Sequence, residues 1–248
     1  MQPETRGRAR IGVLVPYTNT NLEPDMMVLR PPDTTVHFAR MGGYDIDEIP
    51  GSEQMAGLGS SDISDALAMI AAVRPHVVLY GCTSATLTHG SAFDSDLAEM
   101  IKSGSGALSF TAAGSLATAL ETLGVTRIGF ASPYLGEIND QAMAFLADNG
   151  VETVKCHDIG RPLGNYGQGE LTPDEVYDLA LSADHADAEA VVLSCTDMRS
   201  VEVVDRLEKT LGKPVVTSNQ AMMFNLMRAL GLSRHDRLPG RLFDCLSG

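Results

Sequence analysis

Several features that mark common classes of protein are missing from this chain of 248 residues. No run of about 18 apolar residues occurs, which excludes a membrane-spanning helix of ordinary length. The four cysteines, at 82, 156, 195 and 245, include no C-x-x-C pair. Disulfides and structural zinc are therefore not expected in a chain with no recognisable export signal, and we predict a cytoplasmic protein.

Basic residues are also scarce, with 18 Lys and Arg against 32 Asp and Glu and a formal net charge of -14. Nucleic-acid binding depends on basic patches, and none is visible, so we expect neither a nucleic-acid nor a membrane partner. The acidic balance does not exclude a small anionic substrate. Backbone N–H groups at the start of a helix bind carboxylates without any lysine.

Motifs for common cofactors and hydrolases are absent as well. The glycine-rich stretch 160–169 lacks the lysine and the spacing of a P-loop, and Gly104-Ser105-Gly106 has no dinucleotide fingerprint. The six histidines show no metal-ligand spacing, and no G-x-S-x-G motif occurs. We expect neither a cofactor nor a metal ion.

Two stretches with the same design stand out among the residues that are present. Residues 77–84 read V-V-L-Y-G-C-T-S, and residues 191–196 read V-V-L-S-C-T. A short run of Val and Leu is typical of a buried parallel strand, and here each run ends on a cysteine. Because ligands bind at the carboxyl ends of such strands, Cys82 and Cys195 are predicted to lie on opposite sides of one substrate.

Other landmarks recur in the same order. The pattern I-G-x-x-x-P-Y occurs at 11–17 and again at 128–134, an offset of 117 residues, and the two cysteines are 113 residues apart. Residues 215–217 follow Cys195 at about the distance at which 109–111 follow Cys82. Such self-similarity indicates a duplication.

Strand-like and helix-like segments alternate along the chain. Strands are predicted at 11–15, 36–41, 107–111, 151–157 and 215–217, besides the two that end at the cysteines and one that begins at Ile128. Helices are predicted after residue 21 and at about 62–73, 91–102, 112–123, 139–149, 173–182, 200–211 and 220–230.

This alternation predicts an α/β fold with two similar Rossmann-like (flavodoxin-like) parallel-sheet halves, related by a pseudo-two-fold duplication, with the active site between them. We assign residues 9–111 and 218–248 to the first half and residues 112–217 to the second. The sequence indicates no role for the tail at 238–243.

The thiols of Cys82 and Cys195 are the candidate reactive groups. A single buried cysteine is usually a small apolar residue, and we interpret Cys156 and Cys245 in that way. A repeated pair at strand ends favours chemistry instead. The N–H groups and the dipole of a following helix would stabilise the thiolate and lower the pKa of each thiol.

Three polar residues are candidates for substrate binding. Asn19 either caps the first helix or donates its amide to a carboxylate. Tyr134 occupies the matching turn of the second half, and Asn165 lies on the glycine-rich loop, which could fold over a ligand. His89 could approach the site, although a solvated or capping role is expected.

These residues resemble the aspartate/glutamate racemase superfamily over nearly the whole chain. Residues 15–23, V-P-Y-T-N-T-N-L-E, are similar to the Pro-Ser-Ser-Asn-Thr-Thr-Met-Glu opening of maleate cis-trans isomerases. Residues 131–134 and Asn165 fall where that family keeps a substrate-binding tyrosine and asparagine, and residues 213–217 are family-like. Residues 81–84 and 240–244 look more like arylmalonate decarboxylases, which have glycine at the first cysteine position.

The resemblance implies a role for each candidate residue. Cys82 would be the nucleophile and Cys195 the partner acid and base. Asn19, Tyr134 and Asn165 would hold two carboxylates, and a cradle of backbone N–H groups would complete the site; these belong to Thr83, Ser84, Thr196 and Asp197.

The implied activity is the conversion of maleate to fumarate without a cofactor, on a small dicarboxylate substrate. An amino-acid or hydantoin racemase with two cysteines, an enzyme like arylmalonate decarboxylase, and a small dicarboxylate-binding protein without turnover are the alternatives. Both thiols favour isomerase or racemase chemistry over decarboxylation. A homodimer or a homotetramer is compatible with the sequence, which does not fix the oligomeric state.

Overall fold

The computed structural model describes residues 7–42 and 51–246 and contains two four-stranded parallel sheets. The sheets have the orders β2-β1-β3-β4 and β6-β5-β7-β8, so equivalent strands have equivalent neighbours. This repeated order confirms the predicted α/β fold of two similar halves. The strands are β1 (Ala9–Pro16), β2 (Thr34–Met41), β3 (Val77–Tyr80), β4 (Leu108–Thr111), β5 (Arg127–Ser132), β6 (Glu152–Asp158), β7 (Ala190–Leu193) and β8 (Val215–Thr217).

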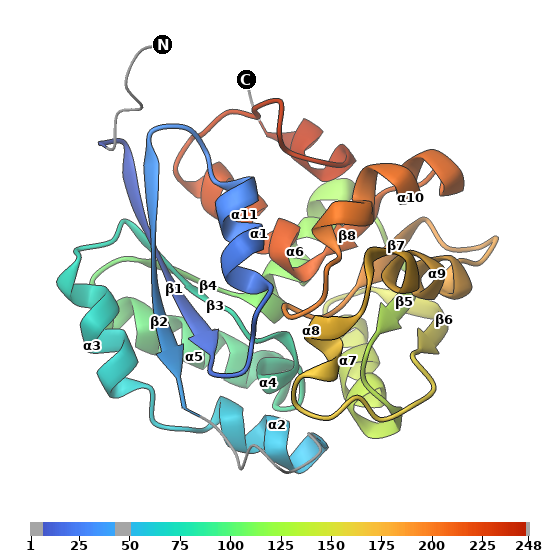
Figure 1. Ribbon diagram of the computed structural model, residues 1–248, viewed down its shortest axis with the longest axis horizontal. Coiled ribbons are helices and arrows are strands. Elements are labelled where there is room, and N and C mark those ends of the chain that lie inside the picture. Colours follow the sequence, from blue (N-terminus) through green and yellow to red (C-terminus); the bar gives the residue numbers. More distant parts are fainter. Residues whose placement is uncertain (1–6, 43–50, 247–248) are drawn as a thin grey trace.

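Helices flank both sheets, as expected where crossovers join parallel strands (Figure 1). The α-helices are α1 (Leu22–Leu29), α2 (Ser52–Gly59), α3 (Ser64–Ala72), α4 (Thr83–Leu87), α5 (Gly90–Ser105), α6 (Ala112–Leu123), α7 (Gly136–Asp148), α8 (Gly167–Glu170), α9 (Pro173–Ala183), α10 (Val204–Leu211) and α11 (Ser218–Ala229). Two short 3-10 helices are η1 (Val201–Val203) and η2 (Arg241–Cys245). Within the described ranges, no helix has the length and apolar character needed to cross a membrane.

Cap geometry confirms several predicted helix boundaries. At the start of α9, the Thr172 hydroxyl accepts from the N–H of Glu175, and the Glu175 carboxylate accepts from the N–H of Thr172. α6 spans the predicted residues and ends at Gly124, whose φ is 68°. Gly212 ends α10 in the same way, with a φ of 69°. Glycine suits both positions because a Cβ is strained in the left-handed region.

Other boundaries differ from the prediction. α3 begins at Ser64, because the Asp62 carboxylate accepts from the N–H of Ser64 in a turn that precedes the helix. α7 begins at Gly136, three residues earlier than predicted. α2, α4 and the four-residue α8, which begins inside the glycine-rich stretch 160–169, were not predicted at all. Glycine and serine in the first, and threonine and serine in the second, give weak helical signals.

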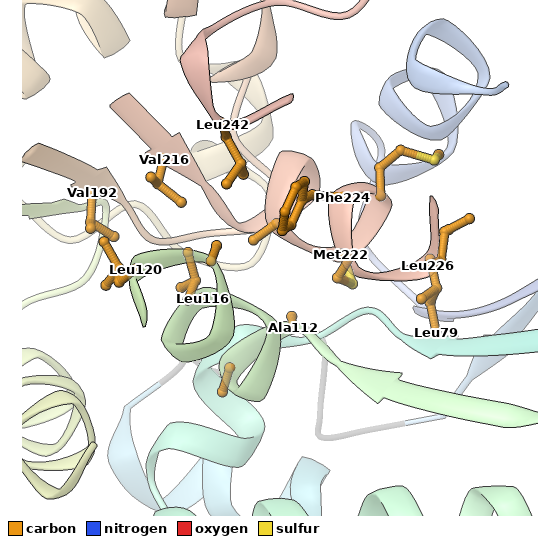
Figure 2. Close-up of a cluster of buried hydrophobic side chains, with 14 of the residues drawn as sticks. Leu79, Ala112, Leu116, Leu120, Val192, Val216, Met222, Phe224, Leu226 and Leu242 are labelled. Atoms are coloured by element: carbon orange, nitrogen blue, oxygen red, sulfur yellow. The ribbon is translucent and has the colours of Figure 1, made fainter. Parts of the chain in front are cut away.

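A layer of buried side chains joins the two sheets (Figure 2). Leu116 of α6 and Phe224 of α11 lie in one apolar cluster with Leu79 of β3 and Val192 of β7. α6 and α11 contact each other, and the cluster that they form reaches strands of both sheets. The packing of these two helices therefore fixes how the halves are oriented.

The tail packs back onto this layer. Leu242 and Phe243 of η2 are fully buried, and the Phe243 ring meets the Phe224 ring edge-on, with centroids 6.3 Å apart. The Gln220 side chain donates to the Pro239 carbonyl at 2.8 Å. The tail, whose role the sequence does not indicate, thus completes the core.

The two sheets lie within residues 9–111 and 127–217. The predicted division gives α11 to the first half, although α11 follows β8 of the second sheet. It gives α6 to the second half, although α6 follows β4 of the first sheet. The division at residues 112 and 218 stays a prediction.

We expect Leu116→Ala to lower the free energy of unfolding by about 2–5 kcal/mol, because it removes packed methyl groups and leaves a cavity. Leu116 is 1% exposed, whereas Leu108 is 42% exposed on β4. Leu108→Ala is the matched control and should lose less than about 1 kcal/mol. Urea unfolding followed by circular dichroism measures both. Equal losses in the two variants would contradict a shared core at Leu116.

Candidate active site

The repeated cysteines lie at the carboxyl ends of the third strands of the two sheets. Cys82 follows β3 and directly precedes α4, and Cys195 follows β7 and opens a turn. Their side chains are 5% and 1% exposed. The position is the one at which open α/β sheets bind ligands. A helix does not follow Cys195 at once, since η1 begins only at Val201.

Close packing requires a glycine before Cys82. A Cβ on Gly81 would clash with the Leu22 side chain and approach the Leu14 carbonyl oxygen to 2.9 Å. The N–H of Gly81 donates to that same carbonyl at 2.9 Å, so the backbone cannot move away. Glycine therefore keeps the Cys82 turn against β1 and α1.

Two hydroxyl groups connect the thiols. The Cys82 Sγ lies 3.8 Å from the Ser84 Oγ, and the Ser84 Oγ lies 3.3 Å from the Tyr134 hydroxyl. The Tyr134 hydroxyl lies 3.2 Å from the Cys195 Sγ. Each of these groups carries an exchangeable proton. The structure thus brings four predicted residues from both halves into one hydrogen-bonded series.

A small cavity opens beside Cys82. It encloses about 340 Å³ of empty space, its mouth included. Cys195 is not on its wall but lies behind Tyr134, so the two thiols do not face each other across open space as predicted. Six predicted residues line the cavity: Asn19, Cys82, Ser84, Tyr134, Thr196 and Asp197.

A larger cavity adjoins the first and shares Tyr134 and Gln168 with it. It encloses about 720 Å³, again with its mouth. Leu135, Ile138 and Leu163 give it a largely apolar lining. Such a lining suits a hydrophobic substituent on a substrate that is held at Cys82.

Asn19 lies in a cap-like position at the start of α1, and its amide donates to a hydroxyl rather than to a carboxylate, so its predicted role in substrate binding stays a prediction. Its Oδ1 accepts from the N–H groups of Asn21 and Leu22 at 3.1 and 2.9 Å, at the start of α1. Its Nδ2 donates to the Thr196 hydroxyl at 3.0 Å, and that hydroxyl donates to the Gly81 carbonyl at 2.9 Å. One amide therefore bridges the turns of the two halves.

Asp197 brings a buried carboxylate to the cavity wall. Its Oδ1 accepts from the N–H groups of Thr20 and Asn21 at 2.8 and 3.0 Å. Burial raises the pKa of this carboxyl, and the hydrogen bonds from Thr20 and Asn21 oppose that rise. Its own N–H donates to the Cys195 Sγ at 3.3 Å. Asp197 therefore ties the second half to the start of α1.

Two predicted binding side chains are not on the cavity wall. The Thr83 hydroxyl donates to the Ser218 hydroxyl at 2.9 Å and so faces α11. Asn165 is buried in the glycine-rich loop, where its main-chain carbonyl accepts from the Gln168 side chain at 3.2 Å. Gln168 lines the cavity instead. Binding roles for Thr83 and Asn165 stay predictions.

Five further lining residues were not found from the sequence: Pro16, Thr18, Met55, Leu58 and Gln168. Met55 and Leu58 belong to α2, which carries no motif and was not predicted. The Met55 sulfur nevertheless accepts from the Ser84 hydroxyl at 2.9 Å. The glycine-rich composition around Gln168 is the one sequence signal that points to it.

Burial dominates the electrostatics of both thiols. It raises the pKa of Cys82, although hydrogen bonds from the N–H of Ala85 and from Ser84 oppose the rise. Burial, followed by the charge of Asp197, raises the pKa of Cys195 from 9.0 to about 12. The prediction of a lowered thiol pKa is therefore wrong. Only the five residues of α4 follow Cys82, a turn follows Cys195, and desolvation outweighs their N–H groups.

The remaining candidates take structural positions. His89 is exposed, contacts the Ala56 carbonyl through Nε2 at 2.8 Å and stacks on Phe93. Cys156 is partly buried, but Cys245 is exposed in η2, so its interpretation as a buried small apolar residue is wrong. Across the described ranges, no cluster of three or more His, Cys, Asp or Glu could hold a metal ion.

Comparisons with known proteins place the chain in a family. The family model for arylmalonate decarboxylase matches residues 11–243. A maleate isomerase of Geobacillus stearothermophilus is 26% identical, and the alignment covers 95% of this chain and 97% of that protein. An arylmalonate decarboxylase of Bordetella bronchiseptica is 28% identical over 65% of this chain and 68% of its own length.

Solved structures share the fold. A Nocardia farcinica maleate cis-trans isomerase bound to TRIS superposes with a TM-score of 0.86 at 24% identity, covering 95% of this chain and 97% of that one. A cysteine-to-serine mutant of that isomerase, which holds a covalently bound succinylcysteine intermediate, gives a TM-score of 0.85 at 24% identity, covering 95% and 98%. The predicted resemblance to maleate isomerases and arylmalonate decarboxylases is thus confirmed. Because the family model spans nearly all of the sequence, the chain belongs to the arylmalonate decarboxylase family.

Proposed function

We propose that the protein is a maleate cis-trans isomerase that needs no cofactor and converts maleate to fumarate. The series from Cys82 through Ser84 and Tyr134 to Cys195, beside one small cavity, is the observation that carries the proposal. The maleate isomerases among its relatives support it. So does the succinylcysteine intermediate of the Nocardia farcinica mutant, because two thiols suit the same covalent chemistry.

Cys82 is the proposed nucleophile. Its sulfur adds to one alkene carbon, so that a C–S bond forms while the π bond breaks and its electron pair moves toward the adjacent carboxylate. The remaining C–C single bond rotates by half a turn. Elimination then returns the electron pair to a trans double bond, breaks the C–S bond and releases fumarate.

Protons balance along the hydroxyl series. As the Cys82 sulfur adds, its proton passes to Ser84, which hands its own proton to Tyr134, and Tyr134 hands one to Cys195. Because Cys195 lies behind Tyr134, its side chain has to turn past the Tyr134 hydroxyl to reach the cavity. It then gives its proton to the second alkene carbon, so addition completes a neutral thiol transfer across the double bond. Elimination runs the series backwards. The high pKa of Cys195 suits a group that stays protonated until the substrate accepts its proton.

Neutral donors hold the two carboxylates in this proposal. Asn19, Ser84 and Tyr134 offer an amide and two hydroxyls, and none of the described residues on the cavity wall carries a positive charge. The N–H groups that follow each cysteine complete the cradle and stabilise the enolate-like charge as it develops. Asn165 would join them only if the glycine-rich loop moves toward the cavity.

Asp197 gives a specific reason to keep a second candidate, a two-cysteine amino-acid racemase. A carboxylate on the wall beside the thiols suits the ammonium group of an amino acid better than a second carboxylate. In that reaction the two thiols would exchange one proton across the α-carbon, with no C–S bond. Hydantoin and arylmalonate substrates would use the adjoining apolar cavity.

Product analysis by NMR distinguishes these reactions. The purified protein is mixed separately with maleate, with each enantiomer of aspartate and glutamate, with a hydantoin and with an arylmalonate. Fumarate from maleate is the expected result. Deuterium exchange at the α-carbon of an amino acid, without fumarate formation, would contradict the isomerase and indicate a racemase. No conversion of any substrate would indicate a binding protein.

Two further expectations accompany the proposal. The enzyme would act in the cytoplasm, and it would assemble as a homodimer or homotetramer. Both stay predictions.

We expect Cys82→Ala to lower kcat/KM for maleate by more than about a thousandfold, because the C–S bond cannot form. Cys156→Ala is the matched control, since it removes a partly buried thiol from β6, away from the cavity, and should stay within about twofold of the parent. Initial rates of fumarate formation measure both, with thermal melts to check folding. A Cys82→Ala protein that turns over normally would overturn the mechanism.

We expect Asp197→Asn to lower KM for maleate by roughly fivefold, because it removes a charge that repels the dianion while its side-chain oxygen still accepts from Thr20 and Asn21. Steady-state kinetics on maleate measure the change. The same variant should weaken the binding of any substrate with an ammonium group. A KM for maleate that rises instead would contradict the proposed repulsion.

A further inference from the structure

A second buried acid lies behind the site rather than on its wall. Asp25, in the first turn of α1, is 7% exposed and is not among the residues that line the cavity. A carboxylate removed from water in this way needs hydrogen-bond donors. The Asn219 amide provides a donor, since its Nδ2 donates to the Asp25 Oδ2 at 2.7 Å.

The same amide nitrogen reaches the turn that carries Cys195. Asn219 Nδ2 also donates to the Thr196 carbonyl at 3.1 Å, while the Thr196 hydroxyl is held by Gly81 and Asn19. The Asn219 Oδ1 finds no donor among residues 7–42 and 51–246. Asn219 is fully buried at the start of α11. Its orientation therefore depends on the two acceptors that its nitrogen joins.

We propose that Asp25 is a positioning residue that acts through Asn219 to hold the turn at Cys195 and Thr196 in the orientation used for catalysis. The inference rests on the proposed function, since it gives Cys195 a role in turnover. Asp25 itself touches neither substrate nor thiol. It acts by fixing which end of the Asn219 amide faces Thr196.

The ionised form of Asp25 is the one that holds the turn. A carboxylate only accepts, so it keeps Nδ2 of Asn219 on its side, where Nδ2 also reaches the Thr196 carbonyl. A protonated Asp25 can donate to Oδ1 after the amide turns over. That rotation would set Oδ1 against the Thr196 carbonyl and lose the hydrogen bond to the turn.

The charges around Asp25 set the pH at which this change occurs. Burial raises the pKa of Asp25 to about 7, against the opposing effect of the Asn219 hydrogen bond. Glu202 of η1 and Asp197 raise it further, and Arg199 lowers it. Asp25 is therefore ionised above neutrality, so the turn is held at higher pH and released as the pH falls below about 7.

The test compares pH profiles of kcat from about pH 5.5 to about pH 8.5. In the parent, kcat should fall by about tenfold for each pH unit below the pKa of Asp25, with little change in KM. Asp25→Asn keeps an oxygen acceptor for Asn219 but cannot titrate, so its kcat should lose this acid limb. Asp65→Asn removes an exposed charge on α3 and should retain it. An acid limb that persists unchanged in Asp25→Asn would overturn the inference.

A second measurement does not depend on the substrate. Modification of Cys195 by methyl methanethiosulfonate, followed by peptide mass spectrometry, reports on the turn even if maleate is not converted. The parent should show a break near pH 7 on top of the steady rise from thiol ionisation, and Asp25→Asn a straight line. Asn219→Ala should also lack the break, and it replaces Asp25→Asn in the test if that variant does not fold. A break in all three proteins, or in none, would refute the role of Asp25.

Discussion

The packing of α6 against α11 is the constraint on which the site depends. The apolar cluster that these helices share includes Leu79 and Val192, each of which precedes its cysteine by three residues. The layer that joins the sheets thus lies directly beneath both cysteine turns. The Thr196 hydroxyl then crosses to the Gly81 carbonyl. Further hydrogen bonds join Asn19 to Thr196, and Thr20 and Asn21 to Asp197, so polar contacts between the turns supplement the orientation that apolar packing fixes.

The same burial explains why the thiols are neutral. Raising the pKa of Cys195 from 9.0 to about 12 favours its neutral form by about 4 kcal/mol relative to water. A helix N-terminus typically stabilises a thiolate by less than about 1 kcal/mol. The five residues of α4 therefore cannot offset the rise that burial causes in the pKa of Cys82. Deprotonation must therefore be coupled to the reaction. The Ser84 and Tyr134 hydroxyls provide that coupling in the proposed mechanism.

The sequence was most informative where a pattern had a single physical cause. The buried strands β3 and β7, the start of α9 and the ends of α6 and α10 each follow from local chemistry, and all were predicted. Duplication then located both cysteines. Repeats specify equivalent places along the chain, and they carry no information on side-chain direction.

Residues that depend on packing between distant segments were not predictable. Met55 reaches Ser84 from α2, and Gln168 reaches the cavity from α8, so only the folded chain brings them there. Thr83 follows Cys82 directly, yet its hydroxyl faces Ser218. The thiol pKa values were predicted with the wrong sign, because local reasoning counts the nearby N–H groups and misses the water that folding removes.

The described cavity wall carries the Asp197 carboxylate and no positively charged side chain, and this has a consequence for the proposed reaction. An arginine on the wall would bind maleate and fumarate alike, and such uniform binding lowers KM without speeding the chemical step. Amide and hydroxyl donors can follow a carboxylate as it rotates, and they hold the product weakly. Asp197 then raises the pKa of Cys195 beyond the effect of burial. In the proposed mechanism both thiols stay protonated until the substrate is in place, because burial raises the pKa of each.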